Sequence, residues 1–193
     1  MAIRSEAYKS LEVDACDNYA TETTPLALIN LSSIWERSIL KNEKLLLSTT
    51  KNDPITIFHG SKTPNLSVTQ YMERIFKYIH CSPSCFVIAQ IYMDRFFQKR
   101  GGYLTSFNAH RLLITSVMVA AKFADDEYYS NAYYAKVGGV SREEMNKMEI
   151  EFLFNLEFRL FVTAEVFLQY CEKLDRTIVG EYRIRCSIIR HAK

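Results

Sequence analysis

Apolar residues recur every three or four positions along most of this chain, a spacing that predicts amphipathic α-helices. Between residues 66 and 174 this pattern is divided by residues that start or stop helices. The predicted helices follow Ser67, run from Pro83 to Gly101-Gly102, cover His110–Phe123, extend from Ser130 to Gly138-Gly139, run from Ser141 to about Glu157, and span Ala164–Leu174. Short, capped connections favour a compact orthogonal or globin-like bundle.

The segment His110–Phe123 is apolar nearly all round, and its middle contains the small residues Ala120 and Ala121. A helix without a polar face is buried by neighbours on several sides. We therefore expect an all-α fold in which five helices pack around this one. Ser67 with Gln70, and Ser141 with Glu144, have the spacing of capping boxes.

A further helix is predicted upstream, from about Leu26 to Leu47, with Pro25 suited to its first turn. Its apolar stripe consists of Leu28, Leu31, Trp35, Ile39 and Leu46. Burial of this stripe against the bundle is one interpretation. The alternative is that part of it stays exposed until a partner covers it.

The two ends of the chain differ in charge. Residues 1–24 hold five acids and few apolar groups, which predicts a flexible arm. Residues 175–193 hold five bases and two acids, which is compatible with a basic tail or a short helix.

Composition narrows the class of protein. The 193 residues are 48% hydrophobic and 24% charged, so disorder of the whole chain is excluded, and a net charge of +2 does not indicate nucleic-acid binding. No apolar run reaches the roughly 18–20 residues that cross a bilayer, and no signal peptide is recognisable, so no membrane association is expected. Five cysteines are an odd number, which favours free thiols in the reducing nucleus or cytoplasm.

The candidate chemistry is sparse. Cys81 and Cys85 are four residues apart with no second pair, so we interpret them as buried small hydrophobes rather than zinc ligands. Residues 125–127 (Asp-Asp-Glu) could form an acidic metal cluster, but a solvated turn after a helix is the simpler interpretation. No Ser/His/Asp set or glycine-rich phosphate loop is recognisable. We therefore expect no catalytic residue, cofactor or metal.

Three charged residues, Asp94, Lys122 and Glu149, fall where the helical period calls for apolar groups. A buried charge must be paired or hydrogen-bonded, because an isolated one costs several kcal/mol. One interpretation is an internal Lys122–Glu149 pair at the surface end of the core. The other is that this pair belongs to a rigid platform facing a partner.

At these residues the sequence resembles the cyclin box. The matching pieces are Ile91–Phe96 around Asp94, Ala120–Phe123 with Asp125-Asp126 behind it, and Met148-Glu149 followed by Phe158 and Leu160. Segments 71–78, 81–86, 110–122 and 131–139 are similar to the plant U-type (P-type) cyclins, small single-box proteins that resemble the phosphate-signalling cyclins of fungi. The resemblance covers about residues 57–174 and implies one five-helix cyclin box there. Together with the patterns above, it divides the chain into a flexible arm at 1–24, an N-terminal helix and linker at 25–56, the box at 57–174, and a basic C-terminal tail or short helix at 175–193.

This resemblance implies a regulatory subunit, not an enzyme, which binds and activates a cyclin-dependent serine/threonine kinase in cell-cycle or cell-division control. In the family, the residues matching Lys122 and Glu149 contact the kinase at its PSTAIRE-type C-helix and activation segment, so an A-type kinase is the expected partner. Apolar residues matching Phe123, Phe158 and Leu160 line the same surface. The aspartate matching Asp94 holds the box together.

The sequence also departs from the family pattern. Pro64-Asn65 replaces the arginine that opens mitotic cyclin boxes, and the substrate-docking patch of Met-Arg-Ala-Ile-Leu type is absent with it. The residues after Leu174 are too few for a second box, and residues 1–24 contain no Arg-x-x-Leu destruction box. The alternative function is a cyclin-fold scaffold that docks proteins or nucleic acid without activating a kinase, which the basic tail favours slightly.

Overall fold

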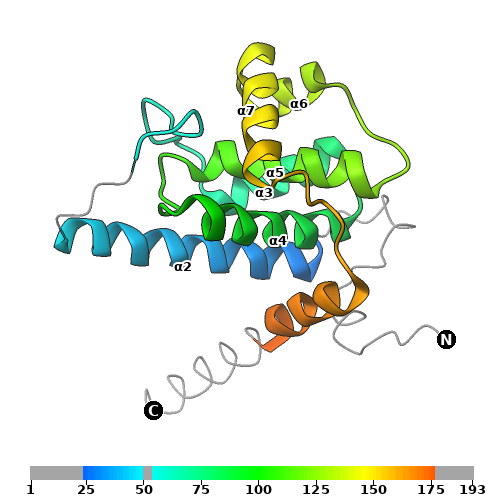
Figure 1. The fold of residues 1–193 in the computed structure, drawn as a ribbon, viewed down its shortest axis with the longest axis horizontal. Helices are drawn as coiled ribbons and strands as arrows, with labels where there is room; N and C mark the ends of the chain where they lie inside the picture. Colours follow the sequence, from blue (N-terminus) through cyan, green and yellow to red (C-terminus); the bar gives the residue numbers. More distant parts are fainter. Residues whose placement is uncertain (1–23, 50–53, 177–193) are drawn as a thin grey trace, which may run out of the picture.

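The computed structural model describes residues 24–49 and 54–176, and all regular secondary structure in this part of the chain is helical (Figure 1). The helices are α2 (Leu26–Ser48), α3 (Val68–Ile79), α4 (Pro83–Arg100), α5 (Ala109–Ala124), α6 (Asn131–Gly138) and α7 (Arg142–Asn155), followed by helical residues 164–176. The all-α prediction is confirmed. Each predicted helix is found within a few residues of its expected ends.

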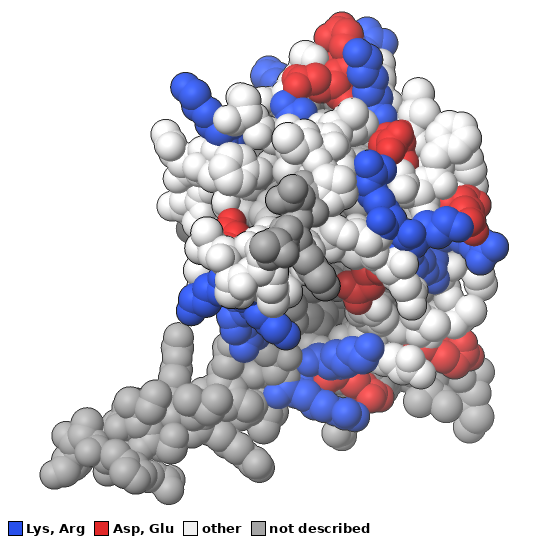
Figure 2. All heavy atoms as spheres, turned by 60° about the vertical axis from the view of Figure 1, so that its left-hand side comes forward, with Lys and Arg blue, Asp and Glu red and all other residues white. Residues whose placement is uncertain are grey.

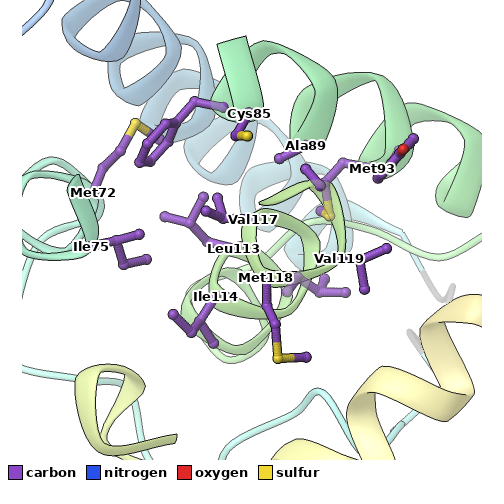
Figure 3. Close-up of a cluster of buried hydrophobic side chains, with 14 of the residues drawn as sticks. Met72, Ile75, Cys85, Ala89, Met93, Leu113, Ile114, Val117, Met118 and Val119 are labelled. Carbon is purple, nitrogen blue, oxygen red and sulfur yellow. The ribbon is translucent and has the colours of Figure 1, made fainter. Parts of the chain in front are cut away.

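The core is built around α5, as its uniformly apolar sequence predicted. Every residue in Leu112–Ala121 is buried, and the helix packs against α3, α4, α6 and α7. Figure 3 shows Leu113 and Val117 directed toward the side chains of α3 and α4, whereas Met118 points the opposite way. Because α5 has neighbours on several sides, it needs no polar face except at its two ends.

Local capping signals place the helices on either side of α5. The Ser67 hydroxyl accepts from the Gln70 N–H and the Gln70 amide oxygen accepts from the Ser67 N–H, both at 3.1 Å. Ser141 and Glu144 form the same reciprocal pair at the start of α7. Both capping boxes are therefore confirmed, because a motif spanning three residues does not depend on the rest of the fold.

Two other helix starts use their serines differently. Pro83 occupies the first position of α4, as expected, but the hydroxyl of Ser82 makes no cap bond and donates to Asp125 at 2.7 Å. Ser130 likewise makes no side-chain cap bond at the start of α6. At α4 the serine hydroxyl thus donates to a tertiary acceptor instead of accepting from a backbone N–H of its own helix.

Helix α2 lies across α3 and α4 (Figure 1). Its buried stripe includes Leu28, Leu31, Trp35 and Ile39, whereas Leu46 is only half-buried. Trp35 is 3% exposed, and its indole N–H donates to the Gln90 side chain on α4. Glu36 accepts a hydrogen bond from the Thr69 hydroxyl on α3 at 2.9 Å. These contacts favour burial of the stripe and make α2 a structural brace.

Cys81, Cys85 and Cys171 are free and buried, so the predicted burial of the first two is confirmed. Cys16 and Cys186 lie outside the described residues. So does the predicted arm at 1–24, apart from Thr24, and the predicted tail beyond Arg176. Within the described ranges, none of the helices has the length and apolar character needed to cross a membrane.

Candidate partner-binding site

Lys122 and Glu149 meet where α5 ends. Lys122 lies in the last turn of α5, Glu149 lies on α7, and the Nζ and Oε1 atoms are 2.6 Å apart. Their side chains are 25% and 17% exposed, so the pair lies at the edge of the core. The pair expected from the helical period is therefore present.

Asn131, the first residue of α6, completes this pair into a network. Its Oδ1 accepts from Lys122 Nζ at 2.5 Å, and its Nδ2 donates to Glu149 Oε2 at 2.6 Å and to Asn146 Oδ1 at 2.8 Å. Both carboxylate oxygens of Glu149 thus have a partner. Removing charges from water is costly, and hydrogen bonds to the remaining lone pairs offset that cost. The network fixes α5, α6 and α7 relative to one another.

Large apolar side chains lie exposed on α5 and α7, which carry the network, and in the segment after α7. Phe123 follows Lys122, and Ile150 follows Glu149. Phe154 lies one turn beyond Ile150, and its ring packs edge-on against Phe158 at 5.3 Å. The exposed fractions are 51% for Phe123, 56% for Ile150, 64% for Phe154, 58% for Phe158 and 72% for Phe161. Aromatic groups gathered at a surface indicate an interaction site more often than a solvated face.

The turn after α7 has an unusual backbone. Glu157 and Phe158 have φ values of +52° and +56°, in the left-handed region that costs a residue with a Cβ about 1–2 kcal/mol. Glu157 also forms an ion pair with Lys99 of α4. Two consecutive residues in this region require support from surrounding contacts, and such outliers are concentrated at functional sites.

Helix α4 supplies that support. Arg95 donates to the carbonyl oxygens of Arg159, at 2.8 Å, and Phe161, at 3.3 Å. The Tyr92 hydroxyl donates to the Leu160 carbonyl oxygen at 2.7 Å. The backbone that carries the exposed phenylalanines is thereby anchored to a buried helix.

Asp94 makes its contacts elsewhere. It is exposed, so its expected place on the apolar face of α4 is wrong. Its two carboxylate oxygens accept from Gln90, at 2.8 Å, and from the Tyr170 hydroxyl, at 2.7 Å. The outer face of α4 at this point faces polar groups of the helical segment 164–176. Asp94 therefore links that segment to α4.

The site residues predicted from the sequence differ in their contacts and in their exposure to solvent. Lys122 and Glu149 are in contact, and the next residue after Lys122, Phe123, is exposed. Phe158 is exposed in the turn after α7, whereas Leu160 is half-buried against the core. Sequence reasoning missed Asn131, Phe154 and Phe161. One usable signal existed, because Phe154 lies off the inward stripe of α7 and one turn after another apolar residue. Asn131 carried no such signal.

A family model described as Cyclin matches residues 7–160, which include α2 to α7 and the whole network. The chain therefore belongs to the cyclin family, whose members are regulatory proteins that generally bind cyclin-dependent kinases. It is similar to the plant P- and U-type members. Cyclin-P3-1 of Oryza sativa subsp. japonica is 51% identical over 172 residues, covering 89% of this chain and 73% of the relative. Cyclin-U4-1 of Arabidopsis thaliana is 52% identical over 147 residues, covering 76% and 73%.

Proposed function

We propose that this chain is the regulatory subunit of a cyclin-dependent serine/threonine kinase, which it binds and activates in the control of the cell cycle or cell division. An A-type kinase with a PSTAIRE-type C-helix is the partner that the site residues favour. The observation that carries the proposal is the half-buried Lys122–Asn131–Glu149 network, together with the exposed phenylalanines at the end of α5, on α7 and in the segment after α7.

The network and the turn after α7 would act as a rigid template. Phe123 and Phe158 bury apolar area against the kinase, while Lys122 and Glu149 fix the register of the contact. A cyclin that binds only the kinase conformation with an inward C-helix shifts the kinase population toward that state. Catalysis, ATP and magnesium then belong to the kinase, and the chain itself is not an enzyme.

The charge on one face of the molecule supports a protein partner rather than nucleic acid. On the face shown in Figure 2, Lys and Arg are interspersed with Asp and Glu around a broad uncharged area. A duplex partner favours a basic stripe. The same proposal places the chain in the nucleus or cytoplasm, where a kinase of this class is available.

Calorimetric titration of a purified A-type kinase tests the proposal. Lys122→Met should weaken binding by about 2–5 kcal/mol, because the Lys122 ammonium would lose its contact with the kinase and leave the polar kinase group that it meets without a charged partner. Arg111→Met is the matched control, since Arg111 pairs with Glu144 and thus also joins α5 to α7. The control should bind like the wild type.

Histone phosphorylation by the assembled complex tests activation. Stimulation by the wild type and loss with Lys122→Met would support the proposal. Equal kinase affinity of the wild type and both variants would contradict the assigned surface. Binding of a DNA duplex without any kinase stimulation would favour the alternative, a cyclin-fold scaffold.

A further inference from the structure

A second cluster of polar side chains lies where the start of α4 meets the end of α5. The Cys81 and Cys85 sulfurs and a carboxylate oxygen of Asp125 all lie within 4.8 Å of one another. Cys81 and Cys85 are 3% and 0% exposed. Among the described residues, this is the one group of three or more His, Cys, Asp or Glu side chains placed to share a metal ion.

Ser82 holds the carboxylate in place. Its backbone N–H donates to Asp125 Oδ2 at 2.9 Å, and its hydroxyl donates to Oδ1 at 2.7 Å. The Ser82 Oγ also lies 3.3 Å from the Cys85 sulfur. Outer hydrogen bonds that orient a ligand in this way are typical of metal centres. Each carboxylate oxygen keeps a second lone pair for a further partner.

We propose, against the interpretation from the sequence alone, that Cys81, Cys85 and Asp125 bind a structural Zn²⁺ ion. Two thiolates and a carboxylate are ordinary zinc ligands, at about 2.3 Å from sulfur and 2.0–2.2 Å from oxygen. The donors of one tetrahedral ion lie about 3.5–4 Å apart, so the side chains move by roughly 1 Å or less. Binding displaces the two thiol protons to solvent.

The residues around the three ligands allow a cation to reach the site from solvent. Asp125 is half-buried and therefore connects the thiols with solvent, and Asp126 and Glu127 are exposed beside it. The bound ion would join the start of α4 to the end of α5, three residues after Lys122. The proposal does not depend on kinase binding.

Metal analysis of the full-length chain, purified under reducing conditions, tests the site. After addition of Zn²⁺ and removal of the excess, the wild type should retain one ion, and Cd²⁺ should produce a thiolate charge-transfer band. Asp125→Asn and Cys81→Ser should weaken Zn²⁺ binding at least tenfold, measured by competition with a chromogenic chelator. Ser82→Ala, which removes one hydrogen bond to the ligand, should weaken it by roughly 10- to 100-fold.

Cys171→Ser is the matched control, because Cys171 is also a buried free thiol but lies in the helical segment 164–176. It should bind like the wild type. Circular dichroism identifies variants that do not fold, and Asp125→Asn keeps an oxygen that can accept from Ser82. Wild-type affinity no greater than that of Cys81→Ser would overturn the proposal. So would an equal loss in Cys171→Ser, or a Cys81–Cys85 disulfide in place of a retained metal.

Discussion

The two ends of α5 carry the same kind of contact in different surroundings. At the first turn, Arg111 pairs with Glu144 at 2.5 Å; at the last turn, Lys122 pairs with Glu149 at 2.6 Å. Both pairs join α5 to α7. The cations are equally exposed, at 25%, but the glutamates differ, with 43% exposure for Glu144 and 17% for Glu149.

Their neighbours explain the difference. Glu144 is part of a capping box, so the start of α7 already gives it a local role. Its partner Arg111 lines a pocket together with Tyr71, His110 and Gly138. Glu149 has no such local role, and its partners Lys122 and Asn131 come from two other helices. An ion pair alone therefore does not indicate a binding surface; a fully bonded network flanked by exposed aromatic groups does.

Besides the loss expected for Lys122→Met, a large effect on kinase binding should come from the aromatic groups. Phe158→Ala should weaken kinase binding by about 2 kcal/mol or more, as expected for an aromatic anchor. Its stability against urea should change little, because Phe158 is 58% exposed and alanine has the same backbone cost at positive φ. Phe107→Ala, at the other end of α5 and 47% exposed, is the control. An equal loss of affinity in both variants would remove the distinction between the two ends.

An intermediate effect is expected for Asn131→Ala. This change leaves Glu149 Oε2 and Asn146 without the amide, so the free energy of unfolding should fall by roughly 1–2 kcal/mol. Urea denaturation measures it. Asn155→Ala provides the comparison, because the Asn155 amide bonds only to Glu151 of its own helix. A variant as stable as the wild type would show that the network does not hold the three helices.

The smallest effect concerns pH. The Ser141 backbone N–H and the Arg111 guanidinium both donate hydrogen bonds to the Glu144 carboxylate, and these bonds lower its pKa below the usual 4.5. The folded state therefore favours the carboxylate, and this contribution is present above pH 4.5 and disappears as the pH falls through the lowered pKa. The stability difference between wild type and Glu144→Gln should shrink accordingly in urea titrations across acid pH. Glu143→Gln is the control for the general effect of removing a carboxylate from the first turn of α7. A difference that stays constant with pH would contradict the assignment.

Much of the fold could be predicted because its determinants are local. The two capping boxes, Pro83 and the glycine stops act over three or four residues, and they defined the helix ends. The apolar pattern of α5 identified the central helix. For the site, the period placed Lys122 and Glu149 correctly, but the same argument placed Asp94 on a buried face that it does not occupy.

By itself, the sequence determined the helices, their order and the central position of α5, because helical periodicity and capping depend on residues that are close together along the chain. It also determined the family, through the resemblance of its motifs to the cyclin box. Only the tertiary structure decided the roles of Asn131, Asp94 and Asp125. Asn131 closes a network with residues of two other helices, and Asp125 reaches Ser82 at the start of α4. Such contacts join residues that lie well apart along the chain. Their geometry follows from how the helices pack, which no local pattern records.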